Sequence, residues 1–202
     1  SDLMALSVYL RTGGLDPAGV TAAIQTIFDR VATYQSAQGY WCYSNAGCDD
    51  SSTTQLVMAG LASARGVFSD AGEAWADAAR LATLNTLTAS ARTGYVDFAT
   101  TGGAGGVLEA DEAGHGYRRG NDPSIQQTAS GTWIQLVGGA DLNDASVQEY
   151  LRWLFNRYRH NETMGEDSGW GSSHYYYLWS SSKAYKFMEE PEIGRASCRE
   201  RV

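Results

Sequence analysis

The sequence has 202 residues, of which 43% are hydrophobic and 11% aromatic, so it can bury a core and is not typical of a disordered chain. Its formal net charge of −8 disfavours a surface that binds nucleic acid or an anionic membrane. No apolar run approaches the roughly 18 residues that a membrane-spanning helix needs. The composition predicts a globular domain, or part of one, with no nucleic-acid partner and no membrane span.

The two ends of the chain have unusual features. Residues 192–202 look like the in-frame translation of a sequencing adapter, so we leave them out of the fold prediction as an artefactual tail. The chain also begins in the middle of a helical pattern. We therefore expect residues 1–191 to be an internal part of a longer bacterial gene recovered from environmental reads, and to form one helical domain.

The first two predicted elements are helices. Residues 2–11 form a short helical pattern that Gly13 and Gly14 close, because glycine takes the left-handed conformation at little cost. Asp16 and Pro17 are the residue types of an N-cap and a first turn. The apolar stripe of this second, outer helix follows the three-four spacing and consists of Val20, Ile24, Ile27, Phe28, Val31 and Tyr34.

Two cysteines, Cys42 and Cys48, lie close together in the loop that follows. We favour a disulfide between them over two free thiols or half a zinc site, because no second Cys/His cluster stands at ligand spacing. No metal and no cofactor is predicted. Outside the tail, the lysines are Lys183 and Lys186, and the chain is rich in Ser, Thr, Gly, Tyr and Trp. This composition indicates export to an oxidising compartment, either secreted or periplasmic.

An inner helix is predicted after this loop. Ser52 and Gln55 have the spacing of a capping box, in which the hydroxyl accepts from the third amide and the Gln side chain reaches back to the cap. Residues 56–62 are apolar or small nearly all round, as in a helix buried on most faces. Asp70 and Glu73 repeat the capping spacing and predict the start of another outer helix.

A long insertion precedes the next inner helix. Residues 93–123 break the helical pattern with a Gly-rich run and a polar stretch, and they are too many for a simple connection. Ser124 and Gln127 again have the capping spacing, and residues 128–137, with Trp133 among them, are mostly small and apolar. A second buried inner helix is therefore predicted here.

The last two predicted helices complete a repeated order. Asn143 and Asp144 cap an outer helix, and Ser173 starts a further inner helix with a run of aromatic residues. The chain thus shows outer helix, polar Gly-containing loop and Ser-capped inner helix three times, which implies a stacked or closed array of helix pairs. The apolar stripe predicted for the outer helix is Val147, Leu151, Leu154, Phe155 and Tyr158.

The motif Gln35-x-x-x-Gly39-x-Trp41, followed by Asp50-Ser-Ser-Thr53, resembles the Gln-Trp repeat of the squalene/oxidosqualene cyclase and protein prenyltransferase superfamily. The resemblance implies an all-α fold, an α/α toroid whose inner helices line a central cavity, here a partial toroid of about three repeats. It also implies that Gln35 ties the end of the outer helix to the next inner helix, stacked against Trp41.

The same resemblance bears on chemistry. A class II cyclase protonates its substrate with Asp-x-Asp-Asp, and Asp49 and Asp50 match the last two positions while Gly47 stands at the first. His174 begins an inner helix, as the zinc-binding His of a prenyltransferase does, but no Cys outside the tail follows Cys48 to join it. The toroid is therefore implied more strongly than either reaction.

Loops that join outer to inner helices should share one rim of a toroid. We interpret Asp49, Asp50 and Glu166 as candidate acid or base residues there, against the favoured alternative that Asp50 caps or positions the helix of Ser52 and the others are solvated loop charges. The other expected rim residues are His115, Tyr117, Asp122, Asp167 and His174. Residues that could line a cavity or bind a ligand are His115, Tyr117, Trp133, His174 and Tyr175, although aromatic residues at consecutive helix positions must partly pack against neighbouring helices.

Three hypotheses follow for the function. The first is a secreted or periplasmic binding or scaffold module with an aromatic-lined cavity for an apolar or isoprenoid ligand or a glycan. The second is a divergent isoprenoid cyclase or transferase, and the third is a glycan-active α/α barrel that uses two rim carboxylates such as Asp50 and Glu166.

Overall fold

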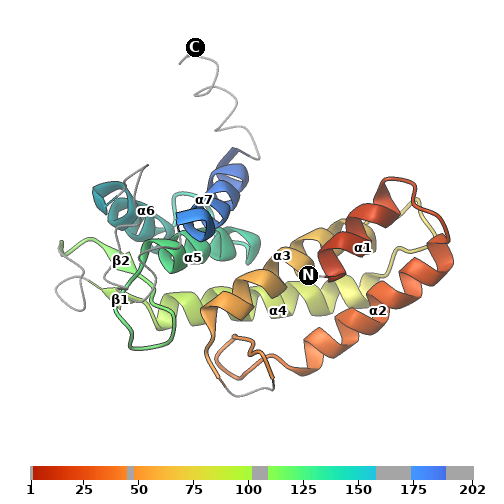
Figure 1. Cartoon of the computed structure of the whole chain (residues 1–202), viewed down its shortest axis with the longest axis horizontal. Coiled ribbons are helices and arrows are strands. Elements are labelled where there is room, and N and C mark those ends of the chain that lie inside the picture. The colour runs from red at the N-terminus through yellow and green to blue at the C-terminus, as the bar shows by residue number, and fades with distance from the viewer. Residues whose placement is uncertain (1, 45–47, 102–108, 158–173, 190–202) are drawn as a thin grey trace, which may run out of the picture. The chain divides into compact units, whose positions relative to one another are not determined.

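The computed structural model describes residues 2–44, 48–101, 109–157 and 174–189. These parts are mostly helical, which confirms the all-α prediction, and they add one antiparallel pair of two-residue strands, with Thr100 opposite Gly114 (Figure 1). No helix in these four ranges is both long and apolar enough to cross a membrane. In chain order the elements are α1 (Asp2–Arg11), α2 (Pro17–Thr33), α3 (Ser51–Phe68), α4 (Ala78–Asp97), β1 (Thr100–Thr101), β2 (Ala113–Gly114), α5 (Ile125–Val137), α6 (Ala145–Arg157) and α7 (His174–Glu189).

The chain divides into two compact units. Unit 1 comprises residues 1–94, with α1, α2, α3 and most of α4. Unit 2 comprises residues 95–202, and it begins with the last three residues of α4. The predicted tail, residues 192–202, lies outside the described residues.

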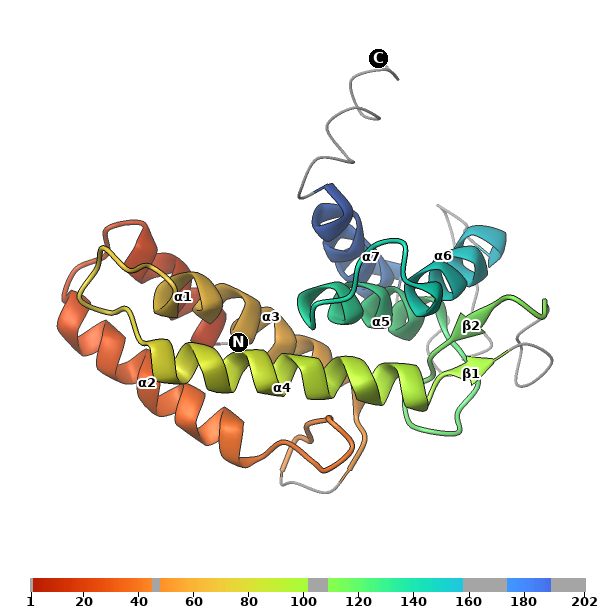
Figure 2. The same ribbon diagram turned by 180° about the vertical axis from the view of Figure 1, so that it is seen from behind.

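In unit 1, α1 packs against both α2 and α3, as the views from the two sides agree (Figures 1 and 2). Phe28 of α2 and Phe68 of α3 meet edge to face in this core, with ring centroids 5.1 Å apart. Asp16 caps α2 as predicted, since its side chain accepts from the Gly19 amide. Arg80 of α4 then joins α4 to α2 by binding Asp29 at 2.7 Å.

Helix α5 is the buried centre of unit 2, where it packs against α6 and α7. Every residue of α5 except Leu136 is buried, so the prediction of a buried helix at this place is confirmed. Gly131 makes the close packing possible, because a Cβ there would lie 2.4 Å from the ring of Tyr150. The Tyr150 hydroxyl in turn donates to the carbonyl of Tyr95 at 2.7 Å.

Of the apolar stripe predicted for α6, Val147 is buried and Leu154 packs against the core, while Tyr158 lies outside the described residues. The prediction is wrong at Phe155, which is 84% exposed, and the helix instead buries Tyr150, Trp153 and Arg157. The reason is Arg157, whose guanidinium lies 4.6 Å from the Trp153 ring and 3.0 Å from the Glu112 carboxylate. A buried ion pair therefore draws this face of the helix inward, and hydrophobicity alone does not indicate it.

Two of the predicted helix starts also need correction. The N-cap of α3 is Asp50 rather than Ser52, because the Asp50 carboxylate accepts from the Thr53 amide at 2.7 Å, and this confirms the favoured structural interpretation of Asp50. Helix α4 starts at Ala78, where Asp77 accepts from the Arg80 amide at 2.9 Å, while Asp70 and Glu73 take part in a turn before it. In both cases a nearby Asp takes the capping role, and its carboxylate is a strong acceptor for the unpaired amides.

Candidate functional site

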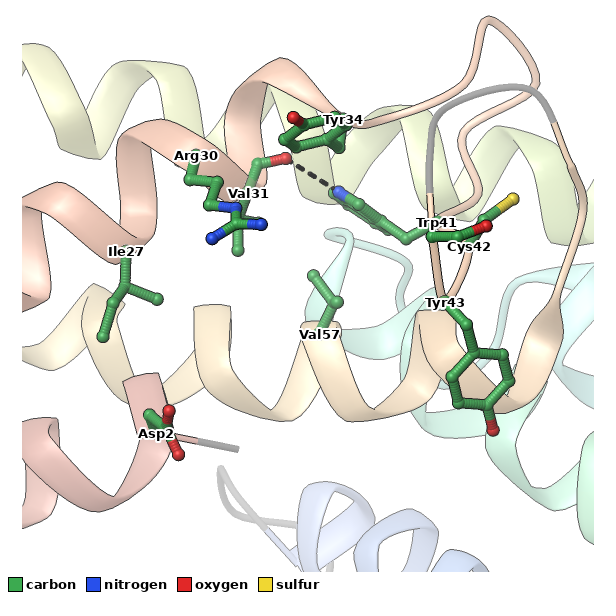
Figure 3. A pocket seen from close by; sticks show the side chains of 10 residues that line it. Asp2, Ile27, Arg30, Val31, Tyr34, Trp41, Cys42, Tyr43 and Val57 are labelled. Carbon is green, nitrogen blue, oxygen red and sulfur yellow. Dashed lines mark hydrogen bonds between the residues drawn. The ribbon is translucent and has the colours of Figure 1, made fainter.

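Unit 1 contains a pocket of about 300 Å³ (Figure 3). Three helices and one loop supply its walls. Aromatic and aliphatic side chains dominate the lining, and Arg30 and Asp2 add one positive and one negative charge. The lining residues are Asp2 from α1, Ile27, Arg30, Val31 and Tyr34 from α2 and its end, Trp41, Cys42, Tyr43 and Ser44 from the loop, and Val57 from α3.

One face of α2 and its end form one wall of this pocket. Ile27, Arg30, Val31 and Tyr34 are spaced three and four residues apart, which places them on the same side of a helix. Sequence reasoning places three of these residues in an apolar stripe that faces the core. The structure divides that stripe, because only Ile24 and Phe28 among the α2 residues are fully buried in the core.

Trp41 joins this wall to the start of α3. Its indole N–H donates to the carbonyl of Val31 at 2.8 Å, shown as the dashed line in Figure 3. Its backbone amide donates to the Thr54 hydroxyl at 3.0 Å, and its backbone pairs with Asp50 in an isolated bridge. Trp41 is 2% exposed, so one residue both lines the pocket and holds the loop between the two helices.

Gln35 does not tie α2 to the inner helix α3, contrary to the expectation from the resemblance. Its side-chain amide donates to the carbonyls of Gly39, at 3.1 Å, and of Leu87 in α4, at 2.9 Å. The cause is the close approach of the loop to α4. Gly39 has a φ of +88°, and a Cβ on it would lie 2.3 Å from the backbone oxygen of Ser90.

The loop beyond Trp41 is closed by a disulfide between Cys42 and Cys48, as predicted. The Cys48 amide also donates to the Cys42 sulfur at 2.9 Å. Ser52, which the sequence places at the cap, instead lies one residue into α3, where its hydroxyl is 3.3 Å from that of Tyr43. The contact between Tyr43 and Ser52 brings a side chain of this loop close to the first turn of α3.

Asp50 is buried at the start of α3, and its carboxylate is used in capping. We expect Asp50→Ala to lower the free energy of unfolding by about 1 kcal/mol, since an N-cap side chain contributes roughly that much. Asp50→Asn should retain most of this stability because Asn caps a helix about as well as Asp. Chemical denaturation followed by circular dichroism measures both, and an equal loss in the two variants would show that the charge, rather than the cap, matters.

In unit 1, the backbone amide of Trp41 binds the hydroxyl of Thr54 and so joins the loop to α3; we call this connection the joint. A second joint of the same kind occurs in unit 2. The His115 amide donates to the Thr128 hydroxyl at 3.0 Å, as the Trp41 amide does to Thr54, and both pairs are 13 residues apart. Ser124 caps α5 by accepting from the Gln127 amide, as predicted. Asp50 and Ser124, the two N-caps, are 74 residues apart. The capping boxes predicted from the sequence instead align Ser52 with Ser124. Because this alignment is two residues out of register, it does not show that Asp50 and Ser124 are equivalent.

His115 stands where unit 1 has Trp41, and it is buried. Its ring stacks on Tyr95 with the centroids 4.3 Å apart, and its Nδ1 lies 2.7 Å from the carbonyl of Gly116. Trp133 is fully buried in α5, whereas Tyr175 is 84% exposed on α7. None of these residues lines the pocket of unit 1.

The structure brings only some of the predicted site residues together. Asp49 and Asp50 belong to unit 1, and His115, Tyr117 and Asp122 to unit 2. Glu166, Asp167 and Ser173 lie outside the described residues, and His174 begins α7 with its side chain likewise outside the description. Their assembly on one rim stays a prediction.

The sequence predicts that Ile27 and Val31 face the core, and it does not single out Arg30 or Val57, so none of these four is predicted to line a pocket. The available signal is a charged residue inside the apolar stripe of α2.

Among the described residues, no group of three His, Cys, Asp or Glu side chains could hold a metal ion. Comparisons with protein-family models, with curated proteins and with solved structures find no match to this chain.

Proposed function

We propose that this chain is part of a helix-pair repeat protein that serves as a binding module and holds a small ligand in the pocket of unit 1. The pocket carries the proposal. Its volume of about 300 Å³ is within the range of small-molecule sites, and its apolar walls with a few polar groups are typical of them. A cavity of roughly half that size binds benzene in another protein, so an aromatic ring with a short polar arm fits here.

The binding role is preferred over the two enzyme hypotheses because of what Asp50 does. An isoprenoid cyclase or transferase would depend on Asp49 or Asp50, and a glycan-active enzyme on Asp50 with Glu166. The Asp50 carboxylate accepts from the Thr53 amide and lies in the joint that holds α3. Because the Asp50 carboxylate is already used to cap α3, its contacts support a structural role for this residue.

The partial α/α toroid and the export of the protein belong to the same proposal. Within unit 1 the predicted inner helix α3 packs on α1, and within unit 2 the inner helices α5 and α7 pack on each other. Such pairing is what a toroid requires of its inner layer. The Cys42–Cys48 disulfide supports an oxidising compartment, secreted or periplasmic. Reduced thiols at both positions, found by mass spectrometry of protein from its native compartment, would contradict export.

We expect Val57→Phe to weaken ligand binding at least about 10-fold, because the larger ring fills space that the ligand needs. The probes are 3-phenylpropan-1-ol and 3-phenylpropanoate, measured by isothermal titration calorimetry. Leu56→Phe is the matched control, since Leu56 precedes Val57 in α3 and does not line the pocket. Binding to neither probe by the unmodified chain, or equal weakening by both variants, contradicts the proposed function.

A further inference from the structure

Among the described residues that line the pocket of unit 1, Arg30 and Asp2 are the two that carry a full charge. Figure 3 shows Arg30 on α2 beside Val31, and Asp2 at the start of α1. Arg30 and Asp2 therefore belong to different walls. A ligand in the pocket encounters a cation on the wall that α2 forms and an anion on the wall that α1 forms.

Arg30 is placed to receive an anionic group. Its guanidinium carbon lies 5.9 Å from the centroid of the Tyr34 ring, which holds the side chain on the wall made by Ile27 and Val31. Arginine presents several N–H donors in a planar fork that matches the two oxygens of a carboxylate. The neighbouring Trp41, Val31 and Val57 offer apolar surface for the remainder of the same molecule.

Asp2 restricts the charge of the ligand further. A second anionic group near α1 would face the Asp2 carboxylate, and like charges repel each other. The walls thus complement a molecule with one anionic end and one uncharged, apolar or aromatic body. A dianion would meet repulsion, and a neutral molecule of the same shape would leave Arg30 without its ionic partner.

We propose that the natural ligand is a small organic acid with a single carboxylate, which Arg30 binds, and an apolar or aromatic body, which lies against Trp41, Val31 and Val57. The inference rests on the proposed function, because it names the class of ligand for the same pocket. It adds a specificity-determining residue, Arg30, and a residue that selects against a second negative charge, Asp2.

Three probes with one body and different heads test the proposal: 3-phenylpropanoate, 3-phenylpropan-1-ol and 3-phenylpropylamine. We expect calorimetry with the full chain at neutral pH to show the acid binding about 10-fold more tightly than the alcohol, which is typical of one charge-assisted hydrogen bond. The amine should bind more weakly than the acid. Phenylsuccinate, a dianion, should also bind more weakly than 3-phenylpropanoate.

Two substitutions assign the effect to the charged residues. Arg30→Gln should abolish the preference, so that the acid and the alcohol bind with equal affinity, whereas Arg11→Gln, which removes the same charge from α1 at a residue that does not line the pocket, should keep the preference. Asp2→Asn should improve binding of phenylsuccinate. A preference for the acid that persists in Arg30→Gln overturns the assignment.

The outcomes separate the two proposals. Equal affinity for acid, alcohol and amine, abolished for all three by Val57→Phe, overturns the carboxylate ligand and leaves the binding function in place. A stronger affinity for the amine has the same meaning. If the unmodified chain binds none of the probes, or if Val57→Phe does not weaken the binding that is seen, both the ligand class and the binding function are overturned.

Discussion

Replacing Arg157 with leucine is expected to lower the free energy of unfolding by about 3–5 kcal/mol, the usual cost of leaving one partner of a buried ion pair alone. Arg157 and Glu112 lie 3.0 Å apart, and their side chains are 9% and 0% exposed. Without the guanidinium, the Glu112 carboxylate keeps a hydrogen bond from Asn156 but loses its counter-ion. Urea denaturation followed by circular dichroism or by amide hydrogen exchange in α5 and α6 measures the change.

The matched control is Arg152→Leu, on the same helix. Arg152 binds Asp111 at 2.9 Å, but the two side chains are 41% and 67% exposed. An exposed pair of this kind contributes less than about 1 kcal/mol, because water screens the charges. If Arg152→Leu and Arg157→Leu cost the same, burial is not the source of the effect and the explanation fails.

The ion pair also predicts a dependence on pH. Burial by itself raises the pKa of Glu112, but hydrogen bonds from Arg157 and Asn156, with the charge of Arg157, outweigh it and lower the pKa below its usual value. The stabilisation is therefore present above the pKa of unfolded Glu, about 4.3, and disappears as the pH falls through the lower folded value. Glu112→Gln should remove this part of the pH dependence. Below about pH 4.3, the free energy of unfolding of the variant should therefore fall less steeply with decreasing pH than that of the unmodified chain.

Trp41→Ala is expected to cost about 3–5 kcal/mol, the range for removing a large buried aromatic side chain. The substitution removes the buried indole ring and its hydrogen bond to the Val31 carbonyl, whereas the backbone amide can still donate to the Thr54 hydroxyl. Trp41→Phe should cost less, because it keeps an aromatic ring and loses the N–H donor and part of the volume. Hydrogen exchange of the amides in α2 and α3 measures the change within unit 1.

The control for Trp41 is Tyr43→Ala, a nearby residue that also lines the pocket but is 72% exposed. Its removal should change the free energy of unfolding by less than about 1 kcal/mol. Because both residues line the pocket, both substitutions should weaken binding of 3-phenylpropan-1-ol. A large loss of stability with Tyr43→Ala, or none with Trp41→Ala, would show that the joint does not depend on Trp41.

The local features that the sequence predicts correctly are those that a few neighbouring residues decide. Asp16 and Pro17 start α2, and Ser124 starts α5, because capping acts over three residues along the chain. Capping signals mislead where two polar residues compete. Asp50 stands two residues before Ser52, and Asp77 follows Asp70 and Glu73, so spacing alone does not tell which one caps the helix.

Pairings between distant residues are the part that the sequence does not reveal. Glu112 stands just before β2 and Arg157 ends α6, and their ion pair places Trp153 and Arg157 in the core while Phe155 stays exposed. Gln35 likewise reaches Leu87, 52 residues further along the chain, because Gly39 lets the loop touch α4. A hydrophobic pattern describes one element at a time, and such contacts depend on the position of a second element.

By itself, the sequence determines that the chain is helical, that α3 and α5 follow polar loops, and that Cys42 and Cys48 are near enough to pair. These properties depend on periodicity, capping and short loops, all of which act locally. The tertiary structure alone decides that Trp41 closes a joint with Thr54, and that His115 and Thr128 repeat it. It also decides that Arg30 lines a pocket, because the other walls come from α1, α3 and a loop that only folding brings to α2.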